Sequence, residues 1–279
     1  MDFGLFVPRG DAERIFASRD VFTREEFATS WVAAGHSPAS ADSVLNYYDG
    51  TGRILRVRRG LYITAESRID PFVIASKLAP GAVIAYSGAL AFHRLHGVGH
   101  SMAVAAPKRA RPFTLNEVCY RTVPHPLPAG RELEHTEEHE HEGIKLRVTT
   151  PARTLVDCMH RLERGPGFLS TFRAFASHPD FHVNLREIAA YAFLLGSKVA
   201  AARTAACLWG HPKWHSLSYD QQCALAALAG RNTVYAVPPP LEEPQYLARI
   251  RVIVPGAFMS IVHSPETIDW RPPGDADYQ

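Results

Sequence analysis

An arginine-rich segment, Arg53–Ile63, constrains the fold of this chain more than any other feature. Apolar and cationic residues alternate in its first half, and this period of two is typical of a β-strand. Gly60 then allows a tight reversal, because glycine accepts positive φ without a Cβ clash. The last residues can return as a second strand. We therefore expect a two-stranded ribbon with Leu55 and Val57 on an apolar face and Arg56 and Arg58 on a cationic face.

Helices with clear start signals precede this ribbon. Thr23 and Glu26 match the capping box, in which each side chain accepts a hydrogen bond from the other residue's backbone N–H. Ser37, followed directly by proline, opens a further helix that we expect to run to about Tyr48. A shorter helix is expected at residues 11–18. Three helices followed by a ribbon is the order of a winged helix-turn-helix.

The helix that opens at Ser37 has two different faces. Its apolar face carries Ala41, Val44, Leu45 and Tyr48. Its other face carries small or hydrogen-bonding side chains that suit contacts with base edges and phosphates, namely Ser40, Ser43, Asn46 and Tyr47. In a winged helix this helix enters the major groove of DNA, so we expect these four residues to bind DNA.

The ribbon would lie on the DNA backbone. Arg56 and Arg58 could neutralise phosphates, with Arg53 and Arg59 at the flanks. If all four do so, they contribute roughly −3.6 to the slope of log K against log salt concentration, at about −0.9 for each phosphate contact. The alternative is a solvated ribbon whose arginines protect an exposed sheet edge from aggregation.

The pattern changes near residue 70, where an Asp-Pro pair indicates a boundary. Short strand patterns and then mostly helical patterns follow. We expect an α+β protein with an N-terminal winged helix-turn-helix and a larger mixed α/β, mostly helical C-terminal domain. The expected units are residues 1–68, residues 69–260, and a loosely ordered tail at residues 261–279.

Composition excludes several classes of protein. The net charge of +2 is too small to indicate a nucleic-acid binder by itself, so that interpretation rests on local clustering. Four scattered cysteines form no C-x-x-C pair, which favours reduced thiols in a cytoplasm. No secretory signal and no apolar run of about 20 residues is present. We expect a soluble, cytoplasmic protein with no membrane association.

The chain offers few candidates for catalysis or metal binding. Residues 132–142 are rich in glutamate and histidine, and on a helix His135 and His139 could share an ion. A solvated linker or hairpin is the preferred interpretation, so we expect no metal and no cofactor. Phosphate-binding glycine loops, H-E-x-x-H and G-x-S-x-G are absent from the sequence. None of the five lysines has a Glu two positions before it. The chain therefore lacks the Glu-x-Lys motif that one type of nuclease carries on a strand. We therefore expect no enzyme.

Five segments together resemble the AbiEi-like antitoxins of type IV toxin–antitoxin (abortive infection) systems. They are Phe22–Phe27, the segment from Gly52 to Tyr62, Asp70–Pro80, Ala85–His93 and Leu146–Asp157. The last segment looks like the family signature T-x-x-R-T-L-V-D, with Arg153 and Asp157 at its charged positions. The resemblance covers most of the chain. It departs from the family near His96, where the family usually has a single His-Gly pair.

The resemblance implies a two-part protein. Its winged helix would repress its own operon by binding inverted repeats of double-stranded DNA in the promoter, with possible pairing of two copies there. Its C-terminal domain would counter a nucleotidyltransferase-like toxin without a stable complex. From the residues alone, Arg153 and Asp157 form an intrahelical ion pair worth about 0.2–0.5 kcal/mol. A general transcription regulator with a C-terminal ligand or dimerisation domain and a nucleic-acid-processing enzyme remain the alternatives.

Overall fold

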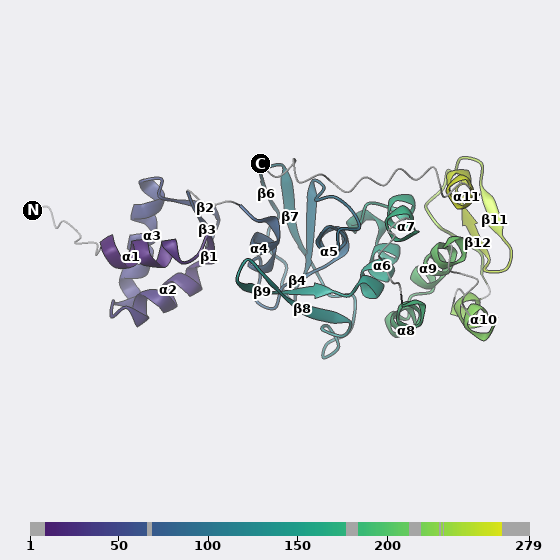
Figure 1. The fold of residues 1–279 in the computed structure, drawn as a ribbon, viewed down its shortest axis with the longest axis horizontal. Helices are drawn as coiled ribbons and strands as arrows, with labels where there is room; N and C mark the ends of the chain where they lie inside the picture. The colour runs from purple at the N-terminus through teal and green to yellow at the C-terminus, as the bar shows by residue number, and fades with distance from the viewer. Residues whose placement is uncertain are drawn as a thin grey trace, which may run out of the picture.

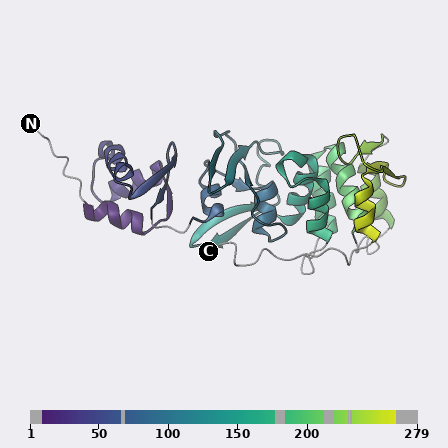
Figure 2. The ribbon, with the colours of Figure 1, turned by 90° about the horizontal axis from the view of Figure 1, so that it is seen from above.

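The computed structural model describes residues 9–65, 69–176, 184–211, 219–228, 230 and 232–263. The molecule is elongated, and three parts follow one another along its long axis (Figures 1 and 2). An N-terminal module of helices with a small sheet comes first, a central sheet domain second, and a mainly helical part third. The fold class is α+β, as expected.

The N-terminal module alternates helices and short strands. Its elements are α1 (Arg9–Ala17), β1 (Val21–Thr23), α2 (Arg24–Ala33), the 3₁₀ turn η1 (Pro38–Ser40), α3 (Ala41–Gly50), β2 (Ile54–Arg58) and β3 (Leu61–Thr64). The strands form an antiparallel sheet in the order β1-β3-β2. Residues 21–23 form β1, which pairs with β3 and so adds a third strand to the predicted two-stranded ribbon.

Local capping signals hold the helices of this module in place. Thr23 Oγ1 accepts a hydrogen bond from Glu26 N at 3.1 Å, and the Glu26 carboxylate accepts one from Thr23 N at 2.7 Å. The predicted capping box is therefore confirmed. Ser37 caps η1 as predicted, and α3 continues directly from it. The module's own core is aromatic and consists mainly of Phe16, Phe22, Phe27, Trp31, Tyr48 and Tyr62.

The central domain is built on a mixed sheet of six strands within the described residues. The strands are β4 (Val83–Ile84), β5 (Ser101–Ala105), β6 (Phe113–Leu115), β7 (Val118–Val123), β8 (Thr136–His141) and β9 (Ile144–Thr149), in the order β6-β7-β5-β4-β9-β8. Two short helices belong to this domain, α4 (Pro71–Ser76) and α5 (Tyr86–Phe92). Helix α5 ends at Phe92, and two residues later Arg94 takes a positive φ of 58°.

Each face of the central sheet packs in a different core. One face, with Val83, Ala103 and Val123, packs with the helices that follow in the sequence. The other face, with Ile84, Val104 and Val148, packs with α4. Val21, Leu61 and Ile63 of the N-terminal sheet belong to this second core. The N-terminal module is therefore joined to the central domain by buried apolar residues.

The third part consists of helices and a small three-stranded sheet, which lies at the end of the molecule away from the central domain (Figure 1). Its elements are α6 (Pro151–His160), the 3₁₀ turn η2 (Leu162–Arg164), α7 (Phe168–Ala176), α8 (Leu185–Leu195), α9 (Lys198–Gly210), α10 (Tyr219–Leu228), β10 (Val234–Tyr235), β11 (Gln245–Leu247), β12 (Val252–Val254) and α11 (Gly256–His263). Because α11 buries Ile261 and ends at His263, the tail predicted from residue 261 is wrong at its start. The rest of that tail, 264–279, lies outside the described residues. No described helix combines the length and apolar character needed to cross a membrane.

Candidate nucleic-acid interface

The two faces of α3 lie as the sequence predicts. Ala41, Val44, Leu45 and Tyr48 are buried in the module's core. Ser43, Asn46 and Tyr47 are exposed on the opposite face, and Tyr47 keeps 41% of its surface accessible. Hydroxyl and amide groups on an exposed helix face can reach base edges in a major groove.

Ser40 differs from the other three residues. Its hydroxyl accepts a hydrogen bond from Trp31 Nε1 at 2.8 Å and donates one to the Ser37 carbonyl oxygen at 2.7 Å. The side chain is half-buried and serves to fix η1 against α2. Trp31 and Ser40 are brought together by the turn between helices. This contact was not foreseen, and it leaves Ser40 committed to the fold rather than open to a base.

Strand β2 departs from the predicted alternation. Ile54 is 1% exposed and packs in the core, whereas Leu55 is 50% exposed, so the predicted inward position of Leu55 is wrong. The pairing of β2 with β3 shifts register between Arg56 and Arg58, which marks a β-bulge. A bulge inserts an extra residue and breaks the alternation of faces. Arg53 and Arg56 remain exposed, as expected for phosphate contacts.

Arg58 and Arg59 follow the bulge and face different surroundings. Arg58 is half-buried, donates a hydrogen bond to the Leu78 carbonyl oxygen, and lies 5.8 Å from the ring centroid of Phe113. Burial lowers the pKa of this guanidinium from its ordinary value. The predicted cationic face shared by Arg56 and Arg58 is therefore wrong, because Arg58 joins the module to the central domain. Arg59 is exposed and lines an adjacent groove.

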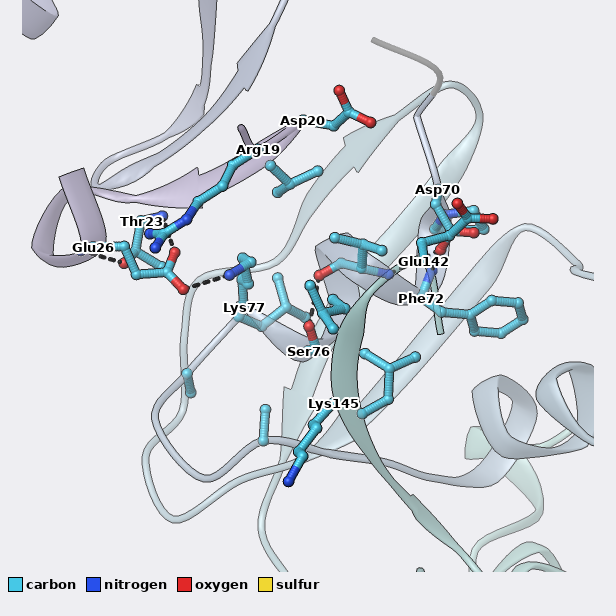
Figure 3. Close-up of a pocket in the computed structure, with 18 of the residues that line it drawn as sticks. Arg19, Asp20, Thr23, Glu26, Asp70, Phe72, Ser76, Lys77, Glu142 and Lys145 are labelled. Carbon is cyan, nitrogen blue, oxygen red and sulfur yellow. Dashed lines mark hydrogen bonds and ion pairs between the residues drawn. The ribbon is translucent and has the colours of Figure 1, made fainter. Parts of the chain in front are cut away.

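This groove, of about 1390 Å³, lies between the N-terminal module and the central domain. Figure 3 shows Glu26 of α2 and Lys77, which follows α4, meeting across it as an ion pair. Burial raises the pKa of Glu26, but hydrogen bonds from Lys77 and from Thr23 N–H outweigh it and leave the pKa below its ordinary value. Sequence reasoning missed this pair, because its partners are 51 positions apart.

The groove carries charges of both signs. Its cationic lining includes Arg19, Arg59, Lys145 and Arg147, and its acidic lining includes Asp20, Asp70, Glu138 and Glu142. Arg147 is paired with Glu138 across strands β8 and β9. The lining therefore favours neither an anionic nor a cationic ligand.

Arg153 and Asp157 lie one turn apart on α6, as the sequence predicts, and both are 0% exposed. Arg153 Nε donates to Asp157 Oδ2 at 3.3 Å. Arg153 Nη1 also donates to the Glu132 and Glu134 carbonyl oxygens at 2.7 and 2.6 Å. The pair therefore joins α6 to the segment before β8. The stabilisation of about 0.2–0.5 kcal/mol that an exposed intrahelical ion pair gives does not apply here. Removing one partner of a buried pair leaves an unpaired buried charge, which costs several kcal/mol.

Burial is also the largest influence on Asp157. It raises the pKa of this carboxyl to about 6, against the opposing effects of Arg153 and of a hydrogen bond from Tyr191. Since the pair is enclosed by α6 and α8, it contacts no solvent-filled space through which a macromolecule could reach it. Its geometry fits a structural element of the C-terminal domain.

The histidine- and glutamate-rich segment forms an edge hairpin of strands β8 and β9, which confirms the hairpin interpretation. His141 Nε2 lies 2.9 Å from Asp70 Oδ2, at the start of α4. His139 lies against the ring of Phe92. Among the described residues, no group of three or more His, Cys, Asp or Glu side chains is arranged to hold a metal ion.

No protein-family model matches the chain, and no curated protein matches its sequence. Among solved structures, the chain is similar to the Rv2827c protein from Mycobacterium tuberculosis, with a TM-score of 0.60 and 14% sequence identity. The match covers 90% of this chain and 93% of that chain. At this identity the likeness concerns the fold alone, and it extends over the N-terminal module, the central sheet and the helical part together.

Proposed function

We propose that this chain is a DNA-binding transcription regulator whose N-terminal module is a winged helix-turn-helix. The observation that carries the proposal is the exposed face of α3, with Ser43, Asn46 and Tyr47, next to the exposed cations Arg53 and Arg56. Hydrogen-bonding side chains on the helix supply base contacts, and the arginines supply phosphate contacts.

Intramolecular contacts offset the acidic residues near this surface. Arg24 forms a bidentate hydrogen bond with Asp42, at 2.6 and 2.7 Å, and so neutralises the carboxylate in the first turn of α3. Asp49 Oδ1 accepts a hydrogen bond from Arg56 N at 3.0 Å. This second contact links the end of α3 to β2. It supports the proposal because it holds the helix and the cationic strand in one fixed arrangement.

We further propose that the regulator is an antitoxin that represses its own operon and counters a nucleotidyltransferase-like toxin. The support is the resemblance to AbiEi-like antitoxins, which includes the Arg153–Asp157 motif on α6. The buried position of that motif fits a role in folding the C-terminal domain. The proposed setting is the cytoplasm, where the DNA partner would lie in the promoter of the chain's own gene.

The DNA-binding part is tested by gel shift with a duplex from the region upstream of this gene. The variant Arg53→Ala/Arg56→Ala is expected to lose affinity and to reduce the salt dependence by about 1.8, at about 0.9 per phosphate contact. Arg173→Ala/Arg186→Ala removes the same charge from exposed positions on α7 and α8 and serves as the control. Equal affinity of the wild type and the first variant would contradict the assignment of these arginines.

The antitoxin part is tested by a growth assay. The chain is co-produced with a nucleotidyltransferase-like protein encoded beside its gene, and growth is compared with production of that protein alone. Restored growth supports the proposal. The groove of about 1390 Å³ favours a second candidate, a regulator that responds to a small ligand. Absence of such a neighbouring gene, together with operator binding that changes with a small molecule, would favour that candidate.

A further inference from the structure

A basic loop of the central domain lies next to the proposed DNA-binding module. The loop runs from Pro107 to Pro112, between β5 and β6, and carries Lys108, Arg109 and Arg111. All three cations are exposed. Among the described residues none of them forms an ion pair, and the nearest acid along the chain is Glu117, after β6. The loop is therefore a patch of uncompensated positive charge.

The loop has a defined conformation. A proline at each end restricts the backbone, and Ala110 N donates a hydrogen bond to Thr122 Oγ1 at 2.6 Å. This tether fixes the middle of the loop to β7. The backbone that carries the three cations is thus held at β7 instead of moving as a free tail, which reduces the entropy lost when they bind a charged partner.

Contacts of the next residue locate the loop relative to the N-terminal module. Phe113 begins β6 directly after the loop and stacks on Tyr120, with ring centroids 5.1 Å apart. Arg58 of β2 lies over the same Phe113 ring at 5.8 Å. The start of β6 therefore touches the end of the arginine-bearing strand, and Figure 1 shows β6 on the side of the central domain that faces β2 and β3.

We propose that Lys108, Arg109 and Arg111 form a second phosphate-binding surface, which extends the DNA contact of the N-terminal module onto the central domain. This inference rests on the proposed DNA binding. Duplex DNA carries one negative charge per about 1.7 Å of its axis, so a duplex held by α3 and β2 presents further phosphates beyond the ribbon. The partner is double-stranded DNA, recognised here by its backbone and without regard to sequence.

The test compares the wild type with a loop variant, a charge control and the Arg53→Ala/Arg56→Ala variant, each as the full chain, on a duplex from the upstream region. Lys108→Ala/Arg109→Ala/Arg111→Ala is expected to bind on the order of 10- to 100-fold more weakly at about 0.1 M salt, with a salt dependence smaller by about 2.7. Arg173→Ala/Arg186→Ala/Lys198→Ala removes equal charge from exposed positions on α7, α8 and α9 and is expected to bind like the wild type. Hydroxyl-radical footprinting should show that the loop variant loses protection only at one flank of the site.

The outcomes separate this inference from the proposed function. If the loop variant keeps wild-type affinity, salt dependence and footprint while Arg53→Ala/Arg56→Ala loses affinity, the second surface is overturned and the DNA-binding module stands. An equal loss in the charge control, or a loss of protection spread over the whole footprint, also overturns it. If the wild type binds no DNA, both proposals fail together.

Discussion

Tyr191 of α8 donates its hydroxyl hydrogen to Asp157 Oδ1 of α6 across 2.8 Å, inside the core of the C-terminal part. Arg153 occupies the other carboxylate oxygen and lies 5.6 Å from the Tyr191 ring centroid. These three side chains connect α6, α8 and the segment before β8.

Asp157→Ala is expected to lower the free energy of unfolding by about 3–5 kcal/mol, because it leaves the buried Arg153 guanidinium without its carboxylate. Urea denaturation followed by circular dichroism measures the change. Glu163→Ala, at an exposed position in η2, serves as a control for the loss of a carboxylate. A destabilisation below about 1 kcal/mol would mean that solvent reaches the pair and compensates the charge.

The same carboxyl should give the folded protein a characteristic pH dependence. Burial raises the pKa of Asp157 to about 6, whereas the unfolded chain titrates near about 3.9. The folded state therefore holds this proton more tightly, so the stabilisation is complete below about pH 4 and is lost as the pH rises through 6. We expect roughly 1–3 kcal/mol of such loss, measured as the difference between the wild type and Asp157→Asn. Parallel stability curves for the two proteins would refute the raised pKa.

Arg56 and Arg58, two positions apart in β2, should respond differently to substitution. Arg56→Ala is expected to weaken binding to all duplexes and to reduce the salt dependence by about 1, because its side chain is free for a phosphate. Arg58→Met is expected to leave the salt dependence unchanged and to lower stability by about 1–3 kcal/mol, through loss of its hydrogen bond to the Leu78 carbonyl. Filter binding over a salt series, paired with thermal denaturation, distinguishes the two. Similar salt effects for both variants would place Arg58 on the DNA.

A side chain at Gly88 of α5 should be unfavourable. A Cβ atom there would lie 2.6 Å from Met102 Sδ and 3.2 Å from the Ala103 carbonyl oxygen. Gly88→Ala is therefore expected to cost about 1–3 kcal/mol through overpacking between α5 and β5. Gly99→Ala, where a Cβ meets nothing within 4 Å, is the matched control. Equal melting temperatures for the two variants would show that the Met102 side chain moves aside.

Features that depend on neighbouring residues could be predicted from the sequence. The capping box of Thr23 and Glu26 and the cap at Ser37 depend on only three or four neighbouring positions, and both are present. The buried and exposed faces of α3 follow from helical periodicity alone. These signals located the exposed residues Ser43, Asn46 and Tyr47 of the candidate site correctly.

Features that depend on distant contacts could not be predicted. The bulge that redirects Arg58 is compensated by Leu78 and Phe113, which belong to another part of the chain. The Ser40 hydroxyl accepts a hydrogen bond from Trp31, and the turn between α2 and η1 brings these two residues together. The groove between the N-terminal module and the central domain is lined by residues of both, so no local sequence pattern predicts it. The alternation of buried and exposed side chains holds for regularly paired strands. It fails in β2, where a bulge turns Arg58 toward contacts in the central domain.

The three apolar residues that the N-terminal sheet contributes to the second core, Val21, Leu61 and Ile63, also affect how the chain comes apart. A fragment that ends at residue 68 would expose this apolar surface to water and favour self-association. In the intact chain, opening the interface exposes the same surface, so melting of the module and of the central sheet is expected to coincide. The N-terminal module therefore draws part of its stability from a domain that follows it in the sequence.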